Sequence, residues 1–370
     1  MMKKNILICL VALCSATMIY AQKKAISQPV KQPYKSWTKL ASSLEDDFFK
    51  TTEARRIGDN VLLYQQTTGG WPKNVYMPAP LNAEEQKKVL TQKNDINRST
   101  IDNKATTTEI TYLARLYNAT QDKKYKEALS SGIDYLLEAQ HDNGGWPQFY
   151  PRPKGYYTHI TYNDDAMINV MKLLRDVAEG KTPFTFLSQD MRQKAQEAVR
   201  KGVDCILKTQ VKQNGRLTVW CAQHDEHTLA PAKARAYELP SLSGAESDNI
   251  VLFLMTLPNP SPEIVRSIEA AVTWFKDSQI NGLKRENFTN AEGKKDYRMV
   301  PCQDSEKCEP LWARFYTLED NRPFFCDRDG IKRYNLSEIG HERRNGYSWY
   351  NNAGTKVLKK YEQWKKKLGD

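Results

Sequence analysis

The chain has 370 residues, of which 27% are charged and 40% hydrophobic, and its mean hydropathy is −0.69. These values exclude a multispanning membrane protein, and 18 glycines with 17 prolines exclude a collagen-like or a disordered Pro/Gly-rich chain. The 55 lysines and arginines outnumber the 44 aspartates and glutamates, which gives a formal charge of +11. Such a surplus indicates an anionic partner, which is a nucleic acid, a membrane face or an acidic substrate.

The first residues have the pattern of a secretory signal. Two lysines precede an apolar run over residues 5–20, and the run ends at Ala21. We predict a signal peptide over residues 1–21, cleaved after Ala21, then a linker over residues 22–42 and one catalytic domain over residues 43–370. A lipoprotein signal at Cys14 is an alternative, although the preceding residue is bulkier than such signals prefer. We therefore expect a secreted or periplasmic monomer that binds an acidic polymer, with no nucleic acid and no membrane as its partner.

Five cysteines remain after removal of the signal, and they show no CxxC spacing. This is a poor zinc signature, whereas one or two disulfides are compatible with an oxidising compartment. Cys302 and Cys308 lie close together in a polar segment and are the first pair to test. Buried free thiols are the alternative.

The rest of the chain has helical periodicity nearly throughout. Apolar residues recur at steps of three and four over residues 105–117 and 166–178, and residues 192–210 and 264–279 continue the pattern. No stretch has several regular strands of period two. The sequence therefore predicts an all-α protein.

A repeat organises these helices. Four helical segments each end in a glutamine, a short polar run and a glycine that can end a helix in the left-handed conformation. The four sets are Gln66 with Gly69 and Gly70, Gln140 with Gly144 and Gly145, Gln210 with Gly215, and Gln279 with Gly282. Three of these stops are followed at nearly the same offset by Trp71, Trp146 and Trp220.

Each repeat is long enough for two helices and a loop. We predict that these helical hairpins close into an (α/α) toroid or barrel, with long loops forming a cleft on one concave face. An open α-solenoid is the rival architecture, but its repeats are normally shorter. Aromatic residues in the loops are typical of a carbohydrate cleft.

Two aspartate-bearing segments stand at helix starts about one repeat apart. Asp102 and Asn103 precede one helix, and Asn163, Asp164 and Asp165 precede another. Capping of the helix is the structural explanation for a single Asp or Asn. Adjacent carboxylates exceed what a cap needs, and oxygen ligands from two neighbouring loops suit Ca²⁺.

Other charged groups lie in the second half of the chain. The sequence HDEH at residues 224–227 lacks the helical spacing of zinc proteases and has no obvious third ligand. Lys233 and Arg235 follow it in a proline-flanked loop, with Glu238 as a countercharge. Arg328 lies nearer the C-terminus, among further arginines and aromatic residues. Structural ion pairs are the alternative for these arginines.

Several blocks in one order resemble the family 10 polysaccharide lyases, which are pectate lyases. The similarity runs from about residue 45 to 360. The blocks are GGWPKN, TIDNKATTTEITYLARLY, GGWPQFYP, HITYNDDAM, PAKARAYELPS, DRDG and ERRNGYSWY. The resemblance implies an (α/α) toroid, Ca²⁺ dependence and β-elimination of polygalacturonate.

The resemblance also implies roles for individual residues. Asp164 resembles a Ca²⁺ ligand, Asp102 a second acid required for catalysis at the metal, and Arg235 the catalytic base. Asp165 is a further candidate ligand, because the resemblance does not decide which neighbour points inward. Arg328 resembles an arginine that binds a substrate carboxylate. Further candidates for substrate binding are Asn103, Lys233, Trp71 and Trp146, with Lys233 also the alternative base.

The function expected from this resemblance is Ca²⁺-dependent anti-β-elimination of (1→4)-α-D-galacturonan to 4,5-unsaturated oligogalacturonides. An inverting glycoside hydrolase is a rival, with Asp102 and Asp164 as its acid and base. A second rival is a binding protein for acidic glycans that has no catalytic activity. An arginine base needs a lowered pKa, and we expect burial and nearby positive charge to provide it.

Overall fold

A computed structural model describes residues 35–152, 154–303 and 308–369. The predicted signal peptide and the first part of the predicted linker lie outside these residues, so both stay predictions. None of the described helices is long and apolar enough to cross a membrane.

The structure is about 47% helical. The α-helices are α2 (Lys35–Ser43), α3 (Thr52–Tyr64), α4 (Ala83–Thr91), α5 (Thr107–Thr120), α6 (Lys123–Glu138), α7 (Ala166–Ala178), α8 (Gln189–Thr209), α9 (Ser247–Leu254), α10 (Pro262–Asp277), α11 (His341–Asn345) and α12 (Ala353–Gly369). The 3₁₀ turns are η1 (Asp46–Lys50), η2 (Asp102–Lys104), η3 (Tyr156–Thr158), η4 (Asn163–Asp165) and η6 (Leu336–Glu338).

The strands are short, apart from one hairpin. They are β1 (Ile160–Thr161), β2 (Lys212–Gln213), β3 (Arg216–Leu217), β4 (Gln223–His224), β5 (Leu242–Ser243), β6 (Leu283–Thr289), β7 (Lys295–Pro301), β8 (Trp312–Ala313), β9 (Phe315–Tyr316), β10 (Phe325–Cys326), β11 (Lys332–Arg333) and β12 (Tyr350–Asn351). They form two-stranded antiparallel sheets, and β6 and β7 pair over seven residues each, from Leu283 opposite Pro301 to Thr289 opposite Lys295.

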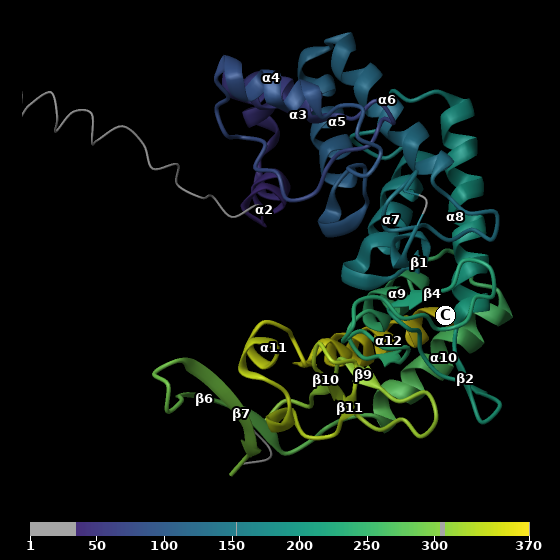
Figure 1. Ribbon diagram of the computed structural model, residues 1–370. Coiled ribbons are helices and arrows are strands. Elements are labelled where there is room, and N and C mark those ends of the chain that lie inside the picture. Colours follow the sequence, from purple (N-terminus) through teal and green to yellow (C-terminus); the bar gives the residue numbers. More distant parts are fainter. Residues whose placement is uncertain (1–34, 153, 304–307, 370) are drawn as a thin grey trace, which may run out of the picture.

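The helices pack as hairpins in two rows. Helix α5 packs on α6, and α7 packs on α8. Helices α5, α7 and α9 contact one another in sequence and form one row, while α6, α8 and α10 form the second. Helix α12 covers α9 and α10, and Figure 1 shows α3 and α12 at opposite ends of the array.

The prediction of an all-α toroid is wrong. Helical hairpins and their repeat are present, but short antiparallel strand pairs and a long β6–β7 hairpin are part of the fold. These strands come from the polar loops between the repeats. Apart from β6 and β7, each strand has only two residues, which is too few to show a period of two, and burial does not alternate along β6 or β7.

The tryptophans of the repeat stabilise the end of a preceding helix. Each indole Nε1 donates a hydrogen bond of 2.7–2.9 Å to a carbonyl near the C-terminal end of that helix. The donor and acceptor pairs are Trp71 with Val61, Trp146 with Leu136, Trp220 with Ile206, and Trp312 with Phe275. Because the last four carbonyls of a helix lack intrahelical partners, each tryptophan satisfies one of them.

At three of the helix stops, one glutamine side chain connects the stop to the next helical hairpin. The Nε2 of Gln65 donates to Gly69 O in its own turn and to Ala128 O of α6, at 2.8 Å each. Gln140 and Gln210 make the corresponding pair of bonds. The residue that belongs to the repeat is therefore Gln65, one position before the predicted Gln66.

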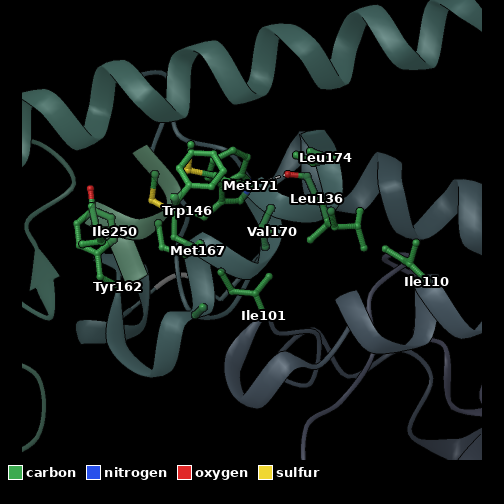
Figure 2. Close-up of a cluster of buried hydrophobic side chains, with 14 of the residues drawn as sticks. Ile101, Ile110, Leu136, Trp146, Tyr162, Met167, Val170, Met171, Leu174 and Ile250 are labelled. Atoms are coloured by element: carbon green, nitrogen blue, oxygen red, sulfur yellow. Dashed lines mark hydrogen bonds between the residues drawn. The ribbon is translucent and has the colours of Figure 1, made fainter. Parts of the chain in front are cut away.

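A large apolar core lies between the two rows, and a smaller buried cluster that includes Phe315 and Trp349 is separate from it. Figure 2 shows Trp146 packed with Met167 and Met171 of α7, close to Leu136 of α6. Gly202 of α8 approaches this cluster so closely that a Cβ there would lie 2.8 Å from the Met171 methyl. Close packing of the rows thus depends on a small residue in α8.

The end of the predicted linker is a helix docked on the domain. In α2, the Trp37 side chain is 2% exposed and its Nε1 donates to Glu109 Oε1 of α5 at 2.8 Å. Its ring lies 5.2 Å from the ring of Tyr112. Helix α2, which lies within the predicted linker, is therefore packed against the predicted domain, and the predicted boundaries stay predictions.

A long insertion interrupts the fourth repeat. Ile280 and Leu311 exchange backbone hydrogen bonds of 2.8 and 3.0 Å, so the chain leaves and returns at one point. The segment between them contains β6 and β7 and the disulfide between Cys302 and Cys308, which confirms the predicted pair. The other described cysteines are buried and free, namely Cys205, Cys221 and Cys326.

Candidate active site

The loops that follow the helix stops line a cavity of about 1070 Å³. Its wall includes η2, η4, the loop around Arg235, the β6–β7 hairpin and residues 345–352. Asp102, Asn103, Asp164 and Arg235 all line it. Three chain segments that are far apart in the sequence thus bring their predicted site residues to a shared space.

The two acidic loops have the same backbone conformation. Asn103 has φ 53° and ψ 31°, and Asp164 has φ 51° and ψ 31°. Residues other than glycine rarely adopt this left-handed backbone conformation, and among them Asn and Asp tolerate it best. Asn103 and Asp164 are therefore equivalent positions in neighbouring repeats, as are Asp102 and Asn163. This equivalence brings both loops to one face of the array.

Asp102 is buried and paired with a lysine. Its side chain accepts a bond from Lys73 Nζ, and its Oδ1 accepts the Asn103 backbone N–H at 3.0 Å. The Asn103 Nδ2 donates to Asn74 Oδ1 at 2.9 Å. These bonds hold the Asp102 carboxylate against the cavity wall.

Asp164 is more open. Its side chain is 50% exposed, its Oδ2 accepts from Asn163 Nδ2 at 2.9 Å, and its Oδ1 lies 3.9 Å from the guanidinium of Arg314. Arg314 is buried and makes a 2.5 Å ion pair with Glu246. Burial is the largest single influence and opposes the charge of this arginine, but the Glu246 carboxylate together with the other acidic groups nearby outweighs it and raises the pKa of Arg314.

Sequence reasoning missed Lys73 and Arg314, as well as Lys284 and Arg285 of β6, all of which line the cavity. Lys73 and Arg314 each stand two residues after a repeat tryptophan, as does Gln148, and all three line the cavity. The shared position two residues after a repeat tryptophan could have identified Lys73 and Gln148 in the sequence as residues of one site. It was hidden for Arg314, because the insertion displaces Trp312 by about 30 residues from its repeat stop.

Arg235 is held by Glu238. Its Nε donates to Glu238 Oε2 at 2.7 Å, and one terminal nitrogen donates to Oε1 at 2.5 Å. Tyr347 also donates to Glu238 Oε1, at 2.7 Å. The bonds to Glu238 raise the pKa of Arg235, so the substrate-free protein favours the charged guanidinium. This is the opposite of the lowered pKa that the sequence led us to expect.

The other candidate residues lie outside this cavity. Asp165 accepts a 3.1 Å bond from Asn249, and burial raises its pKa. Lys233 is exposed, and Arg328 is an exposed arginine that pairs with Glu342 at 3.1 Å. Asp164 therefore lines the cavity whereas Asp165 does not. Neither Lys233 nor Arg328 lies in the cavity with the acidic residues.

Trp71 and Trp146 do not form a sugar platform. Both side chains are 0% exposed, and their indole N–H groups bond to the carbonyls described above. Stacking on a sugar needs an exposed ring face, which neither residue offers. The regular offset of these tryptophans arose from the helix stops rather than from a carbohydrate cleft.

The HDEH sequence divides between two environments. His224 is buried, with its ring nitrogens bonded to Leu229 O and Cys221 N, and burial lowers its pKa to about 4. Asp225 and Glu226 instead approach His159, with one ligand atom of each residue within 4.8 Å of the others. The contact between His159 Nδ1 and Glu226 Oε2 at 2.7 Å is an ion pair when the histidine is protonated. It joins the loops at β1 and β4.

The sequence profile described as pectic acid lyase matches residues 65–358. The chain belongs to the pectic acid lyase family. It is a polysaccharide lyase, which confirms the predicted pectate lyase and sets aside the hydrolase and the binding protein without activity.

Two solved structures are similar to this lyase. One is a family 10 polysaccharide lyase from Cellvibrio cellulosa, with 38% identity, a TM-score of 0.74, and coverage of 90% of this chain and 96% of that one. The other is an aspartate-to-alanine mutant of a family 10 polysaccharide lyase from the same organism in complex with trigalacturonic acid. It has the same identity and TM-score, and covers 90% of this chain and 97% of the other. Comparison with curated proteins gave no match.

Proposed function

We propose that this lyase cleaves polygalacturonate by Ca²⁺-dependent anti-β-elimination in the large cavity. The observation that carries the proposal is the shared wall of Asp102, Asp164 and Arg235. A solved relative that holds trigalacturonic acid supports the substrate class. Export from the cytoplasm, predicted from residues 1–21, agrees with a polymeric substrate.

The oxygen atoms of the acidic loops fit a hard cation. Asp102, Asn103, Asn163 and Asp164 all line the cavity and carry carboxylate or amide oxygens, which are the kinds of ligand that Ca²⁺ prefers. In the described ranges, no cluster of three His, Cys, Asp or Glu ligand atoms includes these residues. The chain alone would therefore supply few ligands, and a uronate carboxylate could complete the set.

The cation, when bound, would stabilise negative charge that develops on the uronate carboxylate as the C5 proton leaves. Asp102 and Asp164 would hold it, because both line the cavity and Asp165 does not. The Lys73 ammonium fixes the Asp102 carboxylate, and Arg314 does the same for the loop of Asp164 through Asn163 Oδ1 at 3.3 Å.

We assign proton removal from C5 to Arg235. The two bonds to Glu238 fix the direction of the guanidinium, and side-chain exposure of 44% leaves it accessible from the cavity. Only its neutral form can accept the proton, so activity should rise with pH as the neutral fraction rises. Lys233 is a weaker candidate, because it does not line the cavity.

The decisive experiment is an ultraviolet assay on polygalacturonate. Absorbance of the unsaturated uronide should rise in the presence of Ca²⁺ and stop on addition of EDTA, and added Ca²⁺ should restore it. Turnover that is indifferent to EDTA would overturn the metal proposal. Chain cleavage without the ultraviolet product would overturn the elimination itself.

A further inference from the structure

The β6–β7 hairpin forms one wall of the cavity and belongs to the insertion between Ile280 and Leu311. Leu283, Lys284 and Arg285 of β6 line the cavity, as do Tyr297 and Met299 of β7. In the first two repeats the glycine stop leads directly into the tryptophan, as at Gly70 and Gly145. The hairpin is therefore an addition to the repeat, placed at the mouth of the site.

Three cations elsewhere on the cavity wall are already paired with acids. Lys73 pairs with Asp102, Arg235 with Glu238, and Arg314 with Glu246. These ion pairs stabilise the loops of the site, and each acid partly neutralises the charge of its cation. A substrate carboxylate would have to compete with them.

Lys284 and Arg285 differ from those cations. Within residues 35–152, 154–303 and 308–369, neither forms an ion pair with an acid, and the residues opposite them in the ladder are the neutral Val300 and Met299. The Nε of Arg285 donates to the neutral Asn287 Oδ1 at 2.9 Å. Both side chains are exposed, so their charges are available to a ligand.

The guanidinium of Arg285 is also held in place. It lies 3.8 Å from the ring centroid of Tyr297, a cation–π contact across the hairpin. A positioned guanidinium binds a carboxylate with less loss of side-chain entropy than a free one. The cavity volume of about 1070 Å³ is at the top of the roughly 300–1,000 Å³ range for small-ligand sites, which leaves space for several sugar residues.

We propose that Lys284 and Arg285 form a remote subsite, which binds the carboxylate of a uronate residue away from the bond that is cleaved. This inference rests on the proposed function, because it assumes a polyuronate in the cavity. The hairpin then makes the lyase prefer long chains, since only a long chain reaches both the acidic loops and the hairpin.

The test compares substrates of different length. In Lys284→Ala/Arg285→Ala, the loss of kcat/KM should grow with chain length, and should be about tenfold larger on polygalacturonate than on trigalacturonate, as expected for one lost charge contact of about 1.4 kcal/mol. Most of this loss should appear in KM. The salt dependence of kcat/KM on the polymer should also become shallower.

The same hairpin provides the matched control. Lys295→Ala/Arg298→Ala also removes two cations from β7, but neither residue lines the large cavity. This variant should keep the chain-length preference of the parent. The exchange Lys284→Arg/Arg285→Lys, which keeps both charges, should retain most of the preference.

Two results would overturn the subsite. One is an equal loss on all chain lengths, and the other is an equal effect of the control pair. Thermal unfolding of each variant shows whether the hairpin is still folded, and variants that unfold are replaced by Lys284→Gln/Arg285→Gln. Failure of the parent protein to form unsaturated uronides would instead refute the proposed function, so the two failures are distinguishable.

Discussion

Arg235 and Glu238 form a two-point ion pair on the cavity wall, with contacts of 2.7 and 2.5 Å. Although burial works against it, the bonds from Arg235 lower the pKa of Glu238, while the same bonds raise the pKa of Arg235. The pair therefore positions the guanidinium but lowers the fraction of its neutral form, which alone can accept a proton. The substrate-free structure favours the charged form of Arg235, whereas proton removal requires its neutral form.

Replacement of Arg235 tests its role directly. We expect Arg235→Ala and Arg235→Lys to reduce kcat by roughly 10²–10⁴-fold, the usual contribution of general acid–base catalysis, because neither variant keeps the guanidinium in place. Binding of trigalacturonate, measured by calorimetry, should persist. Arg216→Lys on β3, outside the cavity, is the control and should keep full activity. Loss of binding in parallel with kcat would make Arg235 a docking residue.

Glu238→Gln should change the pH dependence of turnover. Removal of the carboxylate removes the partner that raises the pKa of Arg235, so the neutral base forms at lower pH. The rising limb of kcat against pH should therefore move to lower pH. Tyr347→Phe, which removes only the 2.7 Å bond to Glu238, should move the limb less. An unmoved limb in Glu238→Gln would contradict a base that is paired with Glu238.

The two adjacent aspartates should respond differently to substitution. Asp164→Asn should raise the Ca²⁺ concentration for half-maximal activity by roughly tenfold or more, because a charged ligand is lost. Asp165→Asn should leave this concentration nearly unchanged, since Asp165 bonds to Asn249 outside the cavity. Ca²⁺ titrations of the ultraviolet assay compare them, with the exposed Asp142→Asn as a further control. A larger effect at Asp165 would reverse the assignment.

Trp146→Phe should affect stability and leave substrate affinity alone. The change removes the 2.7 Å bond to Leu136 O and leaves space beside Met171, which together cost about 1–3 kcal/mol. Denaturant unfolding measures the loss. KM for polygalacturonate should stay within about twofold of the parent, which corresponds to less than about 0.5 kcal/mol. The reason is that the Trp146 side chain is buried and offers no ring face to a sugar. A raised KM without loss of stability would restore the sugar-stacking hypothesis.

Local patterns in the sequence predicted the repeat well. The left-handed glycines after α3 and α6, which are Gly69 and Gly144 rather than Gly70 and Gly145, the similar loops at Asp102 and Asp164, and the disulfide at Cys302 all depend on neighbours in the chain. Such features follow from backbone preference and short spacing, and the structure contains them.

Long-range pairing could not be predicted in the same way. The fourth tryptophan, Trp312, was not recognised because its repeat stop and its indole are separated by a looped-out hairpin whose ends meet only in three dimensions. Arg314 and the β6–β7 wall were missed with it. The role of the tryptophans was also misread, since burial of an indole depends on contacts with distant helices.

Glu109 should make the protein less stable as the pH rises. Burial raises the pKa of Glu109 from 4.5 to about 7, although the Trp37 indole opposes this shift by bonding to its Oε1. Between these values the unfolded chain loses the proton and the folded one keeps it. The free energy of unfolding therefore falls from about pH 4.5 to about pH 7, by about 3 kcal/mol for this group. Asp248, whose pKa burial raises to about 7, adds a slope of the same sign.

Glu109→Gln should flatten this slope, because the amide cannot ionise and its oxygen can still accept the bond from Trp37. Denaturant unfolding at several pH values compares the variant with the parent, and with Glu127→Gln, an exposed glutamate on the neighbouring helix α6. The Glu127 variant should keep the parent slope. Equal slopes in the parent and in Glu109→Gln would mean that Glu109 is charged in the folded protein, and the docking of α2 would then depend on an ionised rather than a neutral acceptor.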